Sequence, residues 1–141
     1  RAVGTPTVSV NPFVPKPATP LQWCAMAPAQ VIKAKLQTLR QALRHESHIR
    51  LKHENLKHDY LEAIRARGDR RPRDFLLETH RQHGDWPRAA RRLGFDAEAF
   101  VCTALPQDTP LPWDFLETER QLQRLHREHD RALSLPVVTG P

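Results

Sequence analysis

The chain has 141 residues, of which 22 are Lys or Arg and 16 are Asp or Glu, so its formal net charge is +6. This length corresponds to one ordinary domain, and the apolar share of 39% predicts a modest hydrophobic core. The sequence has no apolar run approaching the ~18 residues of a membrane span and no signal-peptide pattern, so we expect a cytoplasmic protein without a membrane partner.

The first patterned stretch, residues 7–23, predicts a strand that ends in a rigid, non-helical segment. Val8 and Val10 alternate with polar residues, as in a pleated strand, and we expect this strand to be buried. Four prolines follow within nine residues, at positions 12, 15, 17 and 20. Because each proline fixes its own φ and disfavours helical geometry in the residue before it, residues 11–23 should form a stiff extended segment, called here the proline arm.

A helix is predicted next, beginning at Pro28, since apolar residues recur at positions 32, 36, 39 and 43. A short half-exposed strand is expected at about 48–53, where Ile49 and Leu51 alternate with charged or polar neighbours. Strand, loop and helix in this order form the wall of a parallel barrel. In such a barrel the proline arm would lie at the face where the strands end.

Four short helices are predicted in the next third of the chain, because apolar residues at helical spacing are bounded by Asp, Pro and Gly. Their expected ranges are 59–68, 72–84, 85–94 and 96–101. Gly68 is expected to end the first of them in the left-handed conformation. In the second helix we expect the inward side chains to be Phe75, Leu76 and His80. A small bundle should also contain Trp86, Leu93, Phe95 and Phe100.

The last third is predicted to be a loop, a helix and a tail. Prolines at positions 106, 110 and 112 exclude regular structure over 103–112. Residues 113–116 then lead into a final helix, in which Leu122, Leu125 and His129 keep helical spacing, and the chain ends in a flexible tail at 136–141.

Neither the cysteines nor the histidines predict a metal site. Cys24 and Cys102 are far apart in the sequence and have no CxxC spacing, so we interpret them as small buried thiols. Three pairs of histidines are spaced three residues apart, but none has a cysteine nearby. No residue is therefore assigned a catalytic or metal-binding role.

The densest charge is a run of five arginines within residues 65–73. Together with the net positive charge it suggests an anionic partner such as RNA, with Arg67, Arg70 and Arg71 as the candidate surface. The alternative is a structural network in which these arginines pair with neighbouring acidic residues, Glu62, Asp69 and Asp74.

Three stretches resemble, in the same order, segments of the C-terminal part of cobalamin-binding-type radical S-adenosylmethionine proteins. They are VSVNPFVPKPATPLQW at 8–23, YLEAIRARGDRR at 60–71 and LPWDFL at 111–116. The resemblance implies an α+β, mostly helical chain. Residues 1–55 would form the closing strand and helix of a partial TIM-like barrel, and residues 56–135 a C-terminal helical extension.

The same resemblance implies a parent enzyme that uses S-adenosylmethionine, a [4Fe-4S] cluster and in some members cobalamin. The chain has no loop with three cysteines to hold such a cluster, so it is expected to be inactive alone and to have the rest of the barrel as its partner. The cofactor-facing residues would be Asn11, Phe13 and Lys16. The alternative function is a small basic helical module that binds RNA or a protein.

Overall fold

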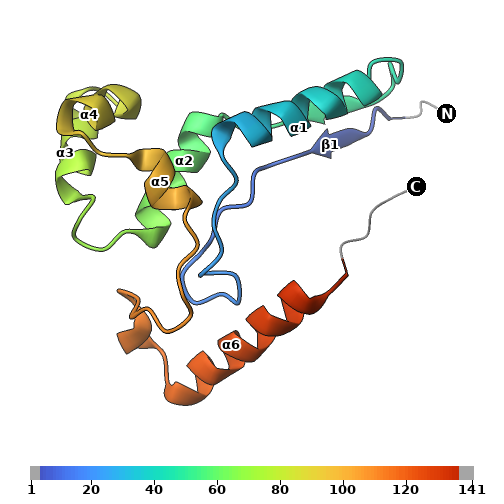
Figure 1. The fold of residues 1–141 in the computed structure, drawn as a ribbon. Helices are drawn as coiled ribbons and strands as arrows, with labels where there is room; N and C mark the ends of the chain where they lie inside the picture. The colour runs from blue at the N-terminus through green and yellow to red at the C-terminus, as the bar shows by residue number, and fades with distance from the viewer. Residues whose placement is uncertain (1–3, 137–141) are drawn as a thin grey trace.

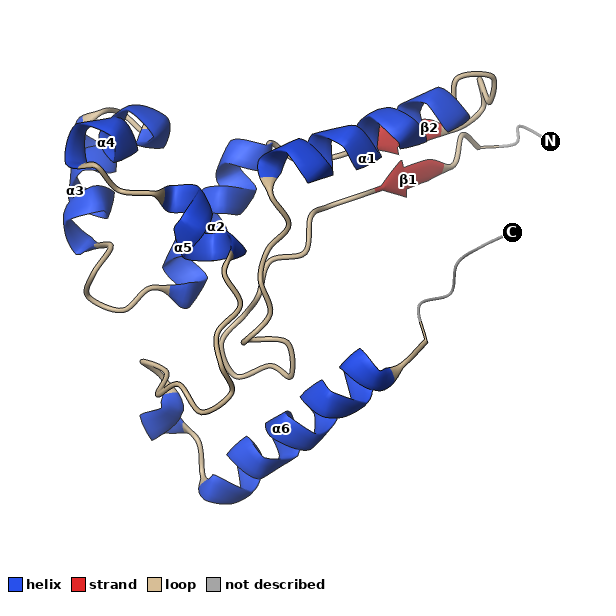
Figure 2. Ribbon diagram, in the orientation of Figure 1, coloured by secondary structure: helices blue, strands red, loops and turns tan. Residues whose placement is uncertain are grey.

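The computed structural model describes residues 4–136, so residues 1–3 and most of the predicted tail, 137–141, lie outside the described part. The described chain is α+β and mostly helical, as predicted (Figures 1 and 2). None of its helices is both long and apolar enough to span a bilayer. The elements are β1 (Thr7–Ser9), α1 (Ala29–Ala42), β2 (Arg50–Lys52), α2 (Leu56–Arg67), α3 (Arg73–Arg81), α4 (Trp86–Leu93), α5 (Ala97–Cys102), the 3₁₀ helix η1 (Asp114–Leu116) and α6 (Glu119–Ser134).

β1 and β2 are parallel and are connected through α1. Val8 pairs with Leu51, and the ladder continues through the Val10 amide, which donates to the Lys52 carbonyl over 2.9 Å. The position of β2 within 48–53 is confirmed. The predicted burial of β1 is wrong for this chain, because all three of its residues are exposed and Val8 keeps 41% of its surface accessible. Parallel strands normally have both faces covered, and this pair does not.

α1 begins directly after Pro28, as the sequence predicts, and its apolar stripe is only partly used. Ile32 is buried and Leu36 packs against the core, whereas Leu39 is 38% exposed. The first half of α1 therefore joins the helical core. The second half runs beside the exposed strands (Figure 2).

The main core lies among α1, α2, α3, α4 and α5. Its aromatic part is continuous, since Phe95 lies 4.6 Å from Phe75 and 5.5 Å from Phe100 between ring centroids, and Trp86 contacts Phe75 edge-on. This confirms the predicted packing of Trp86, Phe95 and Phe100. The buried members of the core are Met26, Ile32, Tyr60, Ala63, Ile64, Phe75, Ala89, Ala90, Ala97 and Val101.

Two residues predicted to face this core do not. Leu93 is 46% exposed, because it is the last residue of α4, whose buried residues are Ala89 and Ala90. His80 is exposed because positions 75, 78 and 79 form the inward face of α3, and position 80 lies outside that arc.

Several helix ends are confirmed by their caps. Asp85 accepts from the Arg88 amide, Asp96 accepts from the Ala99 amide, and Gly94 ends α4 with a φ of 62°. The predicted start of α2 at Asp59 is wrong. Asn55 is the capping residue, its side chain accepting from the Lys57 amide, and Asp59 is buried inside the first turn.

The interpretation of Gly68 as a left-handed residue is also wrong. Its φ of −75° and ψ of 137° are open to any residue. A Cβ at this position would instead lie 2.7 Å from the Ile64 carbonyl oxygen and 2.8 Å from the ring of Pro72. Glycine is needed here because the chain passes this close to the end of α2.

α6 belongs to a second, smaller apolar cluster. Trp23, Leu111 and Leu125 are buried in it, and Leu105 and Trp113 pack against them. Thr118 starts α6 with a capping box to Gln121. Figure 1 shows α6 beside the loop segments and apart from α2–α5, so the proline arm and the segment 105–113 are what attach this helix to the rest of the chain.

Candidate functional site

The proline arm contains no helix or strand, as predicted, but it is not extended throughout, because residues 17–24 form turns and bends; Pro15, Gln22 and Trp23 are its buried residues. No helix or strand is assigned between Val10 and Pro28. Pro15 and Gln22 are almost fully buried, and Trp23 retains only 2% of its accessible surface. The arm turns back on itself where the Gln22 amide donates to the Thr19 carbonyl over 3.1 Å, and Ala18, immediately before this turn, takes a positive φ of 56°.

The buried side chain of Gln22 joins the arm to the LPWDFL segment. Its Oε1 accepts from the Ala18 amide over 2.9 Å and from the Trp113 indole Nε1–H over 2.7 Å. From α6, His129 donates through Nδ1 to the carbonyl of Pro20 over 2.8 Å. Neither contact was predicted from the sequence. His129 was assigned only to the helical spacing of the last helix, and the signal that could have drawn attention to Gln22 is its place between a proline run and a tryptophan.

Phe13 and Lys16, two of the predicted cofactor-facing residues, line one cavity of about 450 Å³ between the arm and α6. Phe13 is 44% exposed and Lys16 is exposed. The Lys16 ammonium forms an ion pair with Glu62 of α2, so its charge is already balanced. Asn11, the third predicted residue, is exposed in the extended segment after β1 and does not line this cavity.

The three arginines predicted to form an anionic-partner surface differ in environment. Arg67 does not belong to a surface, because only 5% of it is exposed and its guanidinium donates to the carbonyls of Val101 and Thr103, each over 2.7 Å. Desolvation lowers the pKa of Arg67, and the nearby thiols of Cys102 and Cys24 act in the opposite direction.

Arg70 and Arg71 remain at the surface. Arg71 pairs with Asp69 through its Nε over 2.9 Å and lies 5.6 Å from the centroid of the Phe100 ring, so the structural network is confirmed for this arginine. Arg70 and Arg71 line a cavity of about 440 Å³ together with Asp69 and residues 110–112. RNA binding stays a prediction that rests on these two residues.

Both cysteines are free and half-buried. Burial raises the pKa of the Cys24 thiol, and the Sγ of Cys102 lies 3.6 Å from the hydroxyl of Tyr60. Within residues 4–136 no three His, Cys, Asp or Glu side chains are grouped so that they could hold a metal ion.

The three stretches that carry the family resemblance meet in space. The Lys16–Glu62 ion pair joins the first to the second, and the Trp113–Gln22 hydrogen bond joins the third to the first. The second and third share the cavity lined by 69–71 and 110–112. The candidate site is thus one continuous region built around the proline arm.

Comparison of the chain with models of protein families, with curated protein sequences and with solved structures gives no match. The role of the proline arm is therefore inferred from its residues, its contacts and the resemblance of the three segments.

Proposed function

We propose that this chain is the C-terminal part of a radical S-adenosylmethionine protein of the cobalamin-binding type. The observation that carries the proposal is the convergence of the three resembling segments. They are separated by dozens of residues in the sequence, yet each contacts or shares a cavity with the other two. Segments that matched a family by chance would have no reason to contact one another, whereas the parts of one functional site would lie together.

The exposed parallel pair supports the same proposal. Parallel strands linked by a crossover helix are the repeating unit of a barrel wall. Here each strand has three residues, and β1 is exposed along its whole length. Two strands alone are marginally stable, and parallel sheets are normally covered on both faces. The N-terminal part of the parent protein would supply the missing strands and cover Val8.

In this proposal the chain positions a cofactor that other residues hold. Two cysteines far apart in the sequence do not fit a [4Fe-4S] cluster, which requires three cysteines on one loop in this family, so the cluster would belong to the N-terminal part. Asn11 and Phe13 are exposed just after β1, where an amide and an aromatic ring could contact S-adenosylmethionine. Lys16 would act by holding the arm on α2 through Glu62.

The first test compares this chain with the longer protein encoded in the same reading frame. Upstream of Arg1 we expect a CxxxCxxC loop. Hydrogen exchange compares the amides of 7–10 and 50–52 in the two proteins. These amides should exchange rapidly in the isolated chain, and their exchange rates should be lower by a factor of about 100 or more in the longer protein, because a central strand opens far less often than a marginal pair. Amides of α2, which lie in the core of both, are the internal control. Equal exchange of the strands in both proteins would contradict the proposal.

The second test concerns the arm. In the longer protein we expect Phe13→Ala to weaken S-adenosylmethionine binding by about tenfold, because a buried aromatic contact is lost, and Asn11→Ala to weaken it by a smaller factor. Leu93→Ala is the matched control, since Leu93 is similarly exposed but lies on α4. Isothermal titration at equal cluster content measures the effect. Unchanged affinity in both arm variants would assign these residues a purely structural role.

A further inference from the structure

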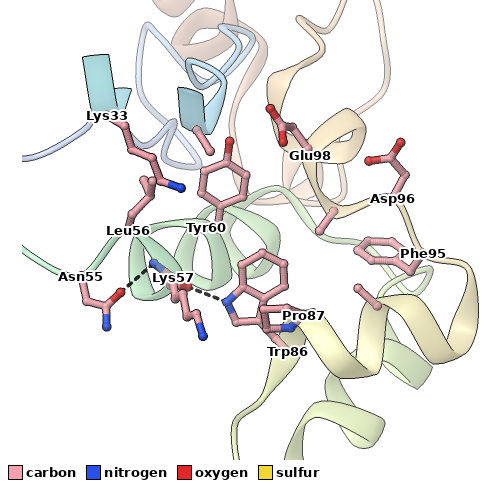
Figure 3. A pocket seen from close by; sticks show the side chains of 13 residues that line it. Lys33, Asn55, Leu56, Lys57, Tyr60, Trp86, Pro87, Phe95, Asp96 and Glu98 are labelled. Atoms are coloured by element: carbon pink, nitrogen blue, oxygen red, sulfur yellow. Dashed lines mark hydrogen bonds between the residues drawn. The ribbon is translucent and has the colours of Figure 1, made fainter. Parts of the chain in front are cut away.

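A second cavity, of about 530 Å³, lies where the N-terminal ends of α1, α2, α4 and α5 meet, away from the proline arm (Figure 3). Its inner wall includes the aromatic residues Tyr60, Trp86 and Phe95, of which Trp86 and Phe95 are half-buried and offer accessible ring surface, whereas Tyr60 is only 3% exposed. The rings of Tyr60 and Trp86 are parallel within 5° at 6.0 Å, and the Trp86 indole donates to the Lys57 carbonyl over 2.8 Å. The aromatic wall is thus held in place before any ligand arrives.

Charged side chains border this wall on two sides. Lys33 from α1 and Lys57 from α2 lie on one side, and Glu98 from α5 lies on the other, with Tyr60 and Trp86 between them in Figure 3. These three residues and Asp96, the fourth charged residue of the lining, are exposed, and within residues 4–136 none of the four has an ion-pair partner closer than 4 Å; the Asp96 carboxylate caps α5 by accepting from the Ala99 amide. The cavity therefore has a positive end, an aromatic middle and a negative end.

This order of chemical groups matches one class of small molecule. We propose that the cavity binds a nucleoside monophosphate whose base carries an exocyclic amine, as adenine and cytosine do. The base would stack on the aromatic wall. The phosphate would bind the two lysines through charge-assisted hydrogen bonds, and the exocyclic amine would donate to the carboxylate of Glu98.

Other small ligands fit less well. An aromatic amino acid has its carboxylate and ammonium on the same carbon, so it cannot place them at opposite ends of the cavity. A purely apolar ligand would leave the unpaired charges without partners. The volume lies within the usual range of roughly 300–1,000 Å³ for ligand pockets. The site lies entirely within this chain, so it does not depend on the function proposed for the proline arm.

The first experiment measures binding of AMP, adenosine and UMP to the 141-residue chain by isothermal titration. We expect AMP to bind about tenfold more tightly than adenosine, because only AMP has a phosphate, and more tightly than UMP, whose base has no exocyclic amine. Lys33→Ala should remove part of this preference for AMP, and the double variant Lys33→Ala with Lys57→Ala should bring the affinity for AMP down to that for adenosine. The matched control is Lys35→Ala, an exposed lysine on the same helix that does not line the cavity, and it should bind AMP as the parent does.

Glu98→Gln tests the other end of the cavity. It should reduce the preference for AMP over UMP, because an amide can donate to a uracil carbonyl while the larger stacking area of adenine remains, and it should preserve the preference for AMP over adenosine. Glu117→Gln, away from the cavity, should change neither ratio. Circular dichroism checks that each variant is folded. The proposal is overturned by the absence of saturable AMP binding at millimolar concentration, by equal affinities for AMP and adenosine, or by an equal loss in Lys35→Ala and Lys33→Ala.

Discussion

Replacing Arg67 by methionine is expected to lower the free energy of unfolding by about 3 to 5 kcal/mol. The Arg67 side chain projects from the last turn of α2, and its two terminal nitrogens donate to the carbonyls of Val101 and Thr103, at the C-terminal end of α5. Carbonyls at that end of a helix have no partner within the helix. Methionine would keep most of the apolar stem and remove both hydrogen bonds, leaving the Thr103 carbonyl without its partner and the buried Val101 carbonyl with only the Met26 amide.

Two further variants make this expectation specific. Arg67→Lys should lower the free energy of unfolding less than Arg67→Met does, because an ammonium can still donate to one of the two carbonyls. It cannot donate to both as the planar guanidinium does. Arg65→Met, on the same turn but exposed, should change the free energy of unfolding by no more than about 0.5 kcal/mol. Urea denaturation followed by circular dichroism measures all three. If Arg67→Met and Arg65→Met unfolded at the same urea concentration, Arg67 would not hold α2 and α5 together.

Replacing Trp23 by alanine is expected to release α6 and to leave the main core folded. Trp23 is the centre of the smaller cluster. The centroid of its ring lies 4.6 Å from the ring centroid of His126 and 5.3 Å from that of His129. Its loss should cost about 3 to 5 kcal/mol, the usual range for removing a buried tryptophan. No buried residue of this cluster belongs to the main core. The destabilisation should therefore weaken the attachment of α6 and leave the main core unaffected.

Hydrogen exchange followed by mass spectrometry distinguishes this local release from global unfolding. We expect protection of the amides in 119–134 to fall by about 100-fold or more in Trp23→Ala, while protection of α2 stays within a few-fold of the parent. Trp113→Phe is the control, because it removes the hydrogen bond to Gln22 but keeps an aromatic ring at the edge of the cluster, and it should loosen α6 less. A uniform loss of protection over α2 and α6 would mean that the two clusters unfold as one unit.

Local chemistry made part of the candidate site predictable. Closely spaced prolines exclude a helix, so the proline arm could be predicted from the sequence without knowledge of its contacts. The arm could also be recognised as the first of the three resembling segments. Its contact with Glu62 and Trp113 could not be predicted, because no local pattern indicates which distant residue a lysine or a glutamine will meet.

The sequence by itself determined the elements whose causes lie within a few residues. Asp85 and Asp96 accept from amides three positions ahead, Gly94 takes a left-handed turn, and a short alternating run forms β2, so each was predictable from its neighbours. The tertiary structure alone decided what depends on distant segments. Gly68 is required by the approach of Pro72, and Arg67 is buried where the end of α5 presents the carbonyls of Val101 and Thr103 to it. Burial and close approach are properties of the packed chain, and nothing in the sequence distinguishes Arg67 from the four arginines near it.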